Sequence, residues 1–334
     1  MISSIYTYAL ANKPKSFTLY SEIKFPEYIK LPFHLLDLVG QGSSSKVYRA
    51  KTIEKDSKIV AVKIIDNTDL NVQKEVLILK NLKSTNIIRL YDAFRHLKKI
   101  YLVFEFVDIL PIALTGNERL IEINFIMYQL LKVLQFCHSN GIMHCDIKPS
   151  NIGLGFSEII KTGSEIIKSS SEIIKTTSGI SRFKSLKLID FGHAQFYWPD
   201  NSYCPSVGTI TYRAPELLFE SKHFSYAVDI WSAGIIFLQL LAPKEAKKLV
   251  AKTNEEQILN LNENFGTDTV VNFCRRYNFT CYKLPHRDGN LIASLKTTDK
   301  DLELALDLLD KMLQIDPANR ITSSDALNHP FIKC

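Results

Sequence analysis

The chain has 334 residues, of which 46% are hydrophobic and 23% charged, so it can bury one large or two moderate cores. Its net charge of +6 fits an anionic ligand or partner, but no dense Lys/Arg tract with interleaved aromatic residues occurs, so direct nucleic-acid binding is not expected. The six cysteines form no CxxC pair, so neither a disulfide framework nor a zinc site is expected. No apolar signal core opens the sequence, and the longest apolar run, residues 230–242, is too short to cross a bilayer. An intracellular, soluble protein without membrane attachment is therefore expected.

The first third of the chain divides into an extension and a small β-rich region. Residues 1–31 are polar and show no clear period, which is typical of an N-terminal extension. Within residues 32–107, branched and aromatic residues cluster or alternate as they do in strands, at 34–40, 46–52, 58–65 and 99–107. Residues 70–82 instead repeat their apolar side chains at helical spacing, which predicts one helix among these strands.

Helical patterns dominate the rest of the chain, residues 108–334. The first of them begins near Glu118 and ends at Gly141, a residue suited to the position after a helix C-terminus. A small β-rich lobe followed by a larger helical lobe predicts a binding site in the cleft between the two.

A low-complexity insertion occupies about residues 155–185. Within it, Ser157 to Thr177 repeat a heptad three times, "SEIIKTG SEIIKSS SEIIKTT". The isoleucine pairs would form an apolar stripe on a helix, but Ile, Ser, Thr and Gly are weak helix formers and three heptads are marginal alone. We favour a flexible or partly ordered surface insertion, with a docked amphipathic helix as the alternative.

Four groups of residues suit phosphoryl transfer, which needs a phosphate cradle, a lysine, acidic groups for a metal ion and a base near the acceptor hydroxyl. In "GQGSSSKV", Gly40 and Gly42 allow close backbone approach to phosphates, although Ser45 stands where a third glycine is usual. Lys63 follows in the strand "VAVK" among apolar neighbours, where a buried ammonium group needs a partner. Glu75, the carboxylate of the following helix, can supply it.

The strongest pattern is "HCDIKPSN" together with "LIDFG". Asp146 would orient the acceptor hydroxyl and take its proton, and Lys148 would neutralise the moving phosphoryl group. Asn151 and Asp190 would hold the metal ion. Farther on, Glu216 in "YRAPE" is a predicted buried acid whose partner is Arg320.

With these motifs, residues 32–334 resemble a eukaryotic protein kinase, and "DIKPSN" is similar to the serine/threonine type. The resemblance implies a bilobal α+β fold, ATP and Mg²⁺ as cofactors, and protein substrates. It also implies that Asp229 anchors the catalytic loop, that Thr209 contacts Asp146 and Lys148, and that Phe104 is the gatekeeper before a hinge at residues 105–107. The nucleotide-binding residues it implies are Val39, Gly40, Gly42, Val47, Ala61, Lys63, Phe104, Glu105 and Val107.

Two subfamilies share features with the chain. "YLVFEFV" and "NEEQILNLNENFGTDTV" are similar to cyclin-dependent kinases, but the helix around Glu75 lacks their cyclin-docking sequence. "GQGSSSKVYRA", "AVDIWSAGIIFLQLL" and "VVNFCRRYNF" are similar to the cell division control protein 7 family, which we prefer. That resemblance implies a nuclear kinase of DNA replication and the cell cycle. It would act on minichromosome maintenance helicase subunits with an activating Dbf-type subunit, whereas the alternative implies a cyclin.

Two cysteines depart from the usual activation switch. Cys145 replaces the arginine that in many kinases binds a phosphate on the activation loop, and Cys204 stands where cyclin-dependent kinases carry the phosphorylated threonine. Because the catalytic residues are intact, we interpret the chain as an active enzyme that does not use this switch and relies on a partner. The alternative from another class is a nucleotide-binding pseudokinase scaffold.

Overall fold

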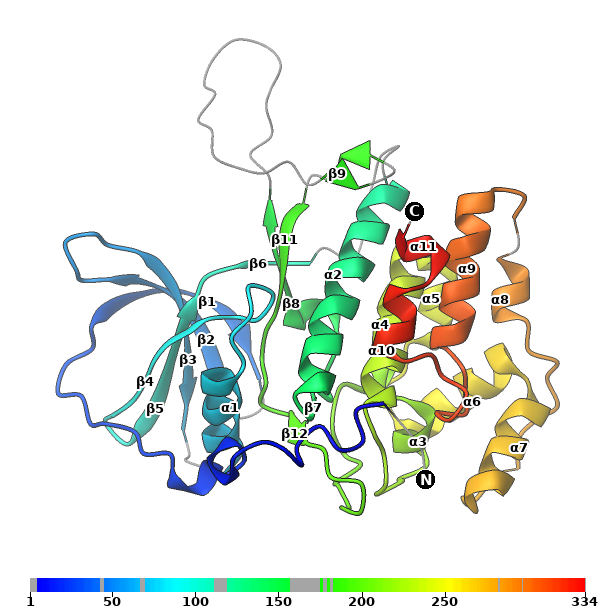
Figure 1. Cartoon of the computed structure of the whole chain (residues 1–334), viewed down its shortest axis with the longest axis horizontal. Helices are drawn as coiled ribbons and strands as arrows, with labels where there is room; N and C mark the ends of the chain where they lie inside the picture. The colour runs from blue at the N-terminus through cyan, green and yellow to red at the C-terminus, as the bar shows by residue number, and fades with distance from the viewer. Residues whose placement is uncertain are drawn as a thin grey trace, which may run out of the picture.

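The computed structural model describes residues 5–42, 45–66, 70–110, 119–156, 175–176, 179–180, 183–281, 283–295 and 297–333. In this part of the chain a twisted sheet with one helix forms one lobe, and a larger group of helices forms the other (Figure 1). The heptads fall largely outside the described residues, so the two interpretations of them stay predictions.

The smaller lobe is a five-stranded antiparallel sheet in the order β1-β2-β3-β5-β4. Its strands are β1 (Phe33–Gln41), β2 (Ser45–Thr52), β3 (Ile59–Ile65), β4 (Leu90–His96) and β5 (Lys99–Glu105). The helix α1 (Leu70–Asn81) packs beside it (Figure 1). Four of these strands and the helix were predicted, whereas β4 was missed because its sequence, LYDAFRH, mixes charged and apolar residues without a clean alternation.

The alternation of side chains along β3 places Lys63 in the cleft. Val60 and Val62 point to one face, where they are buried with Phe94 and Tyr101 in a small core of their own. Lys63 therefore points to the opposite face, toward α1 and the other lobe.

The larger lobe is built around two apolar helices, α2 (Arg119–Ser139) and α4 (Ala227–Leu241), which pack against each other. Among the described helices, α2 is the one long and apolar enough to cross a membrane, but 67% of its apolar window is buried inside the domain, as expected of a core helix. The remaining helices are α3 (Pro215–Leu218), α5 (Pro243–Ala246), α6 (Asn254–Phe265), α7 (Thr267–Tyr277), α8 (Leu291–Ser294), α9 (Lys300–Met312), α10 (Ser323–Leu327) and α11 (Pro330–Lys333).

Short strands at the junction of the lobes carry the loops of the candidate site. The strands β8 (Ile152–Phe156) and β11 (Phe183–Leu188) form an antiparallel hairpin, and β6 (Asp108–Ile109) adds to its edge. The strand β12 (Gln195–Phe196) pairs with β7 (Ile142–Met143), and β9 (Lys175–Thr176) pairs with β10 (Gly179–Ile180). The heptads, within residues 157–182, thus fall in the sequence between the two strands that follow Asn151, as predicted.

The N-terminal extension packs on the domain from residue 5 onward. It contains two short 3-10 helices, η1 (Lys15–Phe17) and η2 (Tyr20–Glu22), and Leu10 within it is only 3% exposed. Figure 1 shows this dark-blue stretch running from beside the helical lobe to α1. The absence of a sequence period reflects a segment without a long helix or strand, which is held by separate side-chain and backbone contacts.

Candidate active site

A cavity of about 470 Å³ opens between the lobes. The strands β1 and β2 cover it from above, and the amide N–H of Gly42 donates to the Ser45 carbonyl at 2.8 Å within their turn. All the residues predicted to bind the nucleotide line this cavity: Val39, Gly40, Gly42, Val47, Ala61, Lys63, Phe104, Glu105 and Val107. A larger, open hollow of about 1230 Å³ lies elsewhere, between residues 5–9 and Phe219–Ser225, and none of the predicted catalytic residues lines it.

Lys63 forms two ion pairs at the back of the cavity. Its Nζ lies 2.9 Å from Glu75 Oε2 and 2.8 Å from Asp190 Oδ1. Burial favours the neutral amine, but the two carboxylates outweigh that effect and raise the pKa of Lys63 above its usual value. The lysine is therefore a fixed positive charge, and the helix α1 stands in the position where Glu75 reaches it.

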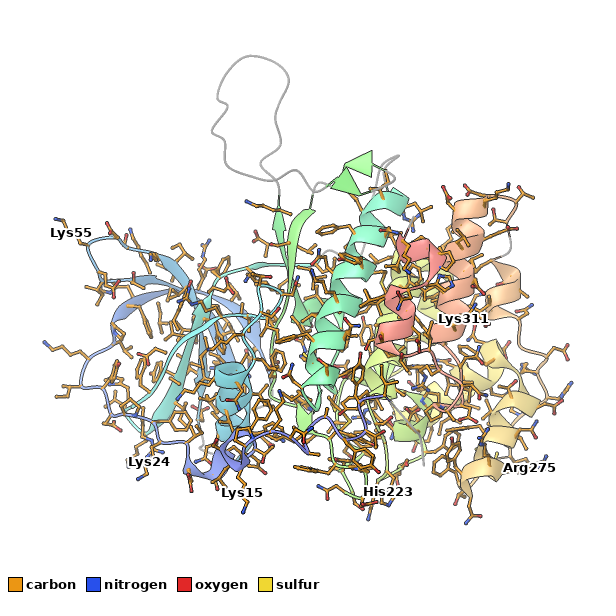
Figure 2. All side chains as sticks on the ribbon, in the orientation of Figure 1. Lys15, Lys24, Lys55, His223, Arg275 and Lys311 are labelled. Atoms are coloured by element: carbon orange, nitrogen blue, oxygen red, sulfur yellow. The ribbon has the colours of Figure 1, made fainter. Side chains whose placement is uncertain are left out.

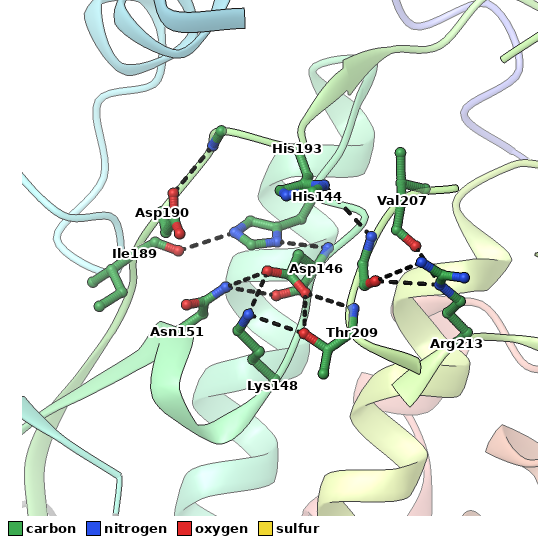
Figure 3. Close-up of polar contacts among 12 residues, drawn as sticks. His144, Asp146, Lys148, Asn151, Ile189, Asp190, His193, Val207, Thr209 and Arg213 are labelled. Atoms are coloured by element: carbon green, nitrogen blue, oxygen red, sulfur yellow. Dashed lines mark hydrogen bonds and ion pairs between the residues drawn. The ribbon is translucent and has the colours of Figure 1, made fainter. Parts of the chain in front are cut away.

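Asp146 is held by three neighbours, Lys148 and Asn151 from its own loop and Thr209 from farther along the chain (Figure 3). Its Oδ1 accepts hydrogen bonds from the backbone N–H and the hydroxyl of Thr209, both at 3.0 Å. Its Oδ2 lies 2.8 Å from Lys148 Nζ and accepts from Asn151 Nδ2 at 3.0 Å. Burial alone would raise the pKa of Asp146, but Lys148 lowers it below its usual value, so this carboxylate is ionised at neutral pH.

Asp229, at the start of α4, fixes the backbone that carries Asp146. Its Oδ2 accepts from the His144 N–H at 2.9 Å, and its Oδ1 accepts from the Cys145 N–H at 2.8 Å. His138 Nε2 lies 3.0 Å from the same carboxylate. Cys145 itself adopts a left-handed conformation with φ of 63°, which is unusual for a residue with a side chain, and these hydrogen bonds hold it there.

Two oxygen donors in the cavity suit a hard divalent cation. Because Asn151 Nδ2 donates to Asp146, its carbonyl oxygen is directed elsewhere and is available as a ligand (Figure 3). Asp190, at the end of β11, offers a carboxylate whose pKa burial would raise but Lys63 lowers well below its usual range. An amide oxygen and a carboxylate are ligands that magnesium-type ions accept together with phosphate oxygens, so the residues fit such an ion.

A buried ion pair supports the lobe behind the site. Arg320 places its two terminal nitrogens 2.9 and 3.1 Å from the two carboxylate oxygens of Glu216, and both side chains are almost fully buried. The predicted pairing of these residues is confirmed.

Sequence reasoning missed two residues that order the segment after Asp190. The Tyr203 hydroxyl lies within hydrogen-bond distance of the Phe196 carbonyl and of both backbone groups of Trp198. Lys74 of α1 donates to Gln195 Oε1 at 2.9 Å. The sequence pointed to these two residues only through their neighbours, because Tyr203 precedes Cys204 and Lys74 precedes Glu75. Neither residue belongs to a recognisable motif.

Cys145 and Cys204, the two cysteines at the positions of the usual activation switch, differ in burial. Cys145 is buried, and burial raises the pKa of its thiol well above the usual value, whereas Cys204 is exposed. Neither residue is an arginine or a threonine, so the pair lacks both parts of the usual phosphate switch, and the Tyr203 hydroxyl instead contacts the backbone of Phe196 and Trp198.

Comparison with known proteins identifies relatives of the whole chain. The family model of the protein kinase domain matches residues 33–332. The chain is 28% identical over 346 residues to a probable serine/threonine-protein kinase of Dictyostelium discoideum, which covers 99% of this chain and 53% of that relative. In the same organism, it is 31% identical to cyclin-dependent kinase 7 and 34% identical to a probable cyclin-dependent kinase 10, in each case over 90% of this chain and 79% of the relative. The chain thus spans about half the length of the first of these relatives.

Proposed function

The chain belongs to the protein kinase family, and we propose that it is a serine/threonine kinase that transfers the γ-phosphoryl group of ATP to protein hydroxyls. The observation that carries the proposal is the hydrogen-bonding of Asp146, whose two carboxylate oxygens are held by Thr209, Lys148 and Asn151 (Figure 3). Positioning and electrostatic stabilisation account for most of the catalysis in this class of reaction, so an ionised and fixed carboxylate at the acceptor hydroxyl is the central requirement.

Each lobe contributes to the proposed transfer. The nucleotide would lie in the 470 Å³ cavity, with Lys63 on its phosphates and the strands β1 and β2 above them. A divalent cation, which we propose is Mg²⁺, would be held by Asn151 and Asp190 and would neutralise charge on the phosphate oxygens.

The acceptor hydroxyl would enter beside Asp146 and Lys148. The carboxylate would orient the hydroxyl and accept its proton, while the ammonium group would balance the charge of the phosphoryl group during transfer. Thr209 holds both of these side chains, because its hydroxyl donates to Asp146 Oδ1 and accepts from Lys148 Nζ at 3.0 Å. We propose that Thr209 couples the substrate-binding segment to the catalytic carboxylate.

The test is peptide phosphorylation by the purified full chain and its Asp146→Asn variant. The variant keeps the shape of the carboxylate but removes its charge, and kcat should fall by about a thousandfold or more. The matched control is Asp200→Asn, a surface position in the same part of the molecule, which should retain full activity. Wild-type activity in Asp146→Asn would refute the mechanism. Nucleotide binding without measurable transfer by the wild-type chain would favour the alternative, a pseudokinase scaffold.

The subfamily is a second, finer proposal. The similarity of several sequence stretches to the cell division control protein 7 family supports a nuclear kinase of DNA replication. Its substrates would be minichromosome maintenance helicase subunits and its activator a Dbf-type subunit. The names of two relatives support the alternative, a cyclin-dependent-kinase-like enzyme with a cyclin. Affinity purification of the chain from its own cells distinguishes them, since recovery of a cyclin would overturn the first proposal and recovery of a Dbf-type protein the second.

A further inference from the structure

The N-terminal segment, residues 5–31, contacts the helical lobe first, then the helix α1 and finally the sheet of the smaller lobe. Its first anchor lies on the helical lobe, where the Tyr226 hydroxyl donates to the Tyr6 carbonyl at 3.2 Å and their rings meet edge-on at 6.0 Å. Leu10 lies directly on Gly141, because a Cβ built there would come within 2.3 Å of Leu10 Cγ. Lys13 Nζ then donates to Asn140 Oδ1 at 2.7 Å. The segment is thus fixed just ahead of the catalytic loop.

The second anchor is the helix α1, which the segment contacts near both ends. Gln73, in the first turn, donates its side-chain amide to the Ile23 carbonyl at 3.0 Å, and Asn81, the last helical residue, donates to the Phe17 carbonyl at 3.0 Å. Between these contacts, the rings of Phe17 and Tyr20 lie against Phe196 of β12, with centroids 6.1 and 6.4 Å apart. A helix tied near both ends can neither translate nor rotate without breaking these contacts.

The third anchor is the strand β4 of the smaller lobe. Tyr28 donates its backbone N–H to the Arg95 carbonyl at 2.8 Å, and Arg95 donates in return to the Pro26 carbonyl at 2.8 Å. The Tyr28 ring stacks on Phe94 with centroids 4.2 Å apart, and its hydroxyl donates to Asp92 at 2.9 Å. The segment therefore connects the helical lobe, α1 and the sheet along one continuous path (Figure 1).

The position of α1 decides whether Glu75 reaches Lys63, because the glutamate projects from the middle of this helix. We propose that residues 5–31 form an intramolecular strap that holds α1 in this position, so that ordering of the Lys63–Glu75 pair needs no separate subunit. Gln73 and Asn81 are positioning residues in this arrangement, because they act on the reaction only through Glu75. The expected effect of the strap on kcat rests on the proposed kinase function, whereas its effect on the position of α1 does not.

The strap competes with the expectation that a partner orders α1. A regulatory subunit that contacted Gln73 and Asn81 would have to displace the chain's own carbonyl groups from them. A partner shifts the equilibrium between the two positions of α1 only by the difference in its affinity for them. If the strap already holds α1 in the position that pairs Glu75 with Lys63, a partner can increase the population of that position only slightly.

The test uses two full-chain variants, one at each end of the strap. The first, Gln73→Ala with Asn81→Ala, removes the two hydrogen bonds to the helix, and because both side chains are only partly buried it leaves the core intact. The second, Leu10→Asp, places a charge in the buried contact with Gly141 and releases the strap from the helical lobe. The matched controls are Lys80→Ala on α1 and Lys15→Ala on the strap, both exposed; Figure 2 shows Lys15 pointing into solvent.

Two readouts separate positioning from general stability. Hydrogen exchange of the amides in α1 should become about tenfold faster in both strap variants and stay unchanged in both controls. With saturating ATP and varied peptide, kcat should fall by up to about tenfold in the strap variants while the KM for peptide changes less than twofold, since the peptide site is not touched.

The outcomes distinguish the strap from the kinase proposal. Faster exchange in α1 with no measurable transfer even by the wild-type chain would support the strap and refute the proposed function. Exchange in α1 that is the same in wild type and in the Gln73→Ala/Asn81→Ala variant would overturn the strap, whatever the activity. Activity that appears only with a cyclin or Dbf-type subunit, together with exchange in α1 that slows when the subunit binds, would also overturn it, because the subunit rather than the strap would then order the helix.

Discussion

Replacing Tyr203 by Phe removes one hydroxyl and leaves the ring in place. That hydroxyl lies 2.6 Å from the Trp198 amide nitrogen and 3.1 Å from the carbonyl oxygens of Phe196 and Trp198. Burial raises the pKa of Tyr203 to about 12, so the hydroxyl stays protonated and donates at neutral pH. A hydroxyl carries one proton, so at any moment it accepts one of these hydrogen bonds and donates one.

The expected cost follows from these two hydrogen bonds. Each contributes about 0.5–1.5 kcal/mol net to stability, which gives about 1–3 kcal/mol for the pair. Trp198 is 39% exposed, so water can replace the lost partner of its amide, and the lower part of the range, about 1–2 kcal/mol, is expected. The ring still packs against Phe224, with centroids 5.3 Å apart, so no cavity term is added.

Urea unfolding and peptide phosphorylation by the full-chain variant measure this cost and its consequence. The free energy of unfolding should fall by about 1–2 kcal/mol and kcat should fall with it, because the hydroxyl orders the segment that carries Thr209. Tyr197→Phe is the matched control, since the described part of the chain shows no hydrogen bond to that hydroxyl. A loss below about 0.5 kcal/mol, or equal losses in the two variants, would refute the reasoning.

Further perturbations test other parts of the molecule. Lys63→Met and Asp190→Asn should each lower kcat in peptide phosphorylation by about a thousandfold without unfolding the chain, and activity within tenfold of wild type would contradict their roles. Replacing residues 157–182 with an Asn-Gly turn should leave the Kd for ATP unchanged, because loop closure depends weakly on length; failure to fold would show that the heptads dock as a helix. Phosphatase treatment should not lower kcat and Cys145→Arg should not raise it, because Cys204 offers no phosphate. If phosphatase does lower kcat and mass spectrometry maps the removed phosphate to residues 202–211, another basic residue must bind that phosphate. Burial would raise the pKa of Asp190, but Lys63 lowers it below its usual value. The ionised carboxylate therefore stabilises the fold fully above about pH 5, and this contribution falls as the pH falls. Between pH 6 and pH 3, urea unfolding should show a smaller loss in the free energy of unfolding for Asp190→Asn than for wild type.

Most residues of the candidate site could be predicted because each lies in a short contiguous motif. Asp146, Lys148 and Asn151 are within six residues of one another, so the local turn alone brings them together, and Asp190 follows directly from an apolar strand. The pairing of Lys63 with Glu75 could be predicted from chemistry, because a lysine in a buried strand needs a carboxylate and one helix offered it.

The contacts of the strap could not be predicted in this way. Asn81 donates to the carbonyl of Phe17 and Gln73 to the carbonyl of Ile23, and a backbone carbonyl has no residue type by which to find it. Leu10 is a single apolar residue in a polar stretch, so it produces no period, although its burial against Gly141 anchors the segment. Tyr203 was missed for the same reason, because its partners are also backbone atoms.

The path of the N-terminal segment also affects where the domain should be cut for biochemical work. The family match begins at residue 33, and a protein trimmed to that boundary would lose Leu10, Phe17 and Tyr28 together with their contacts. Such a fragment would expose the apolar surface that these side chains now cover, on Gly141, Phe196 and Phe94. Poor solubility or weak transfer by the trimmed fragment would then report on the loss of residues 1–32 rather than on the chemistry of the cleft.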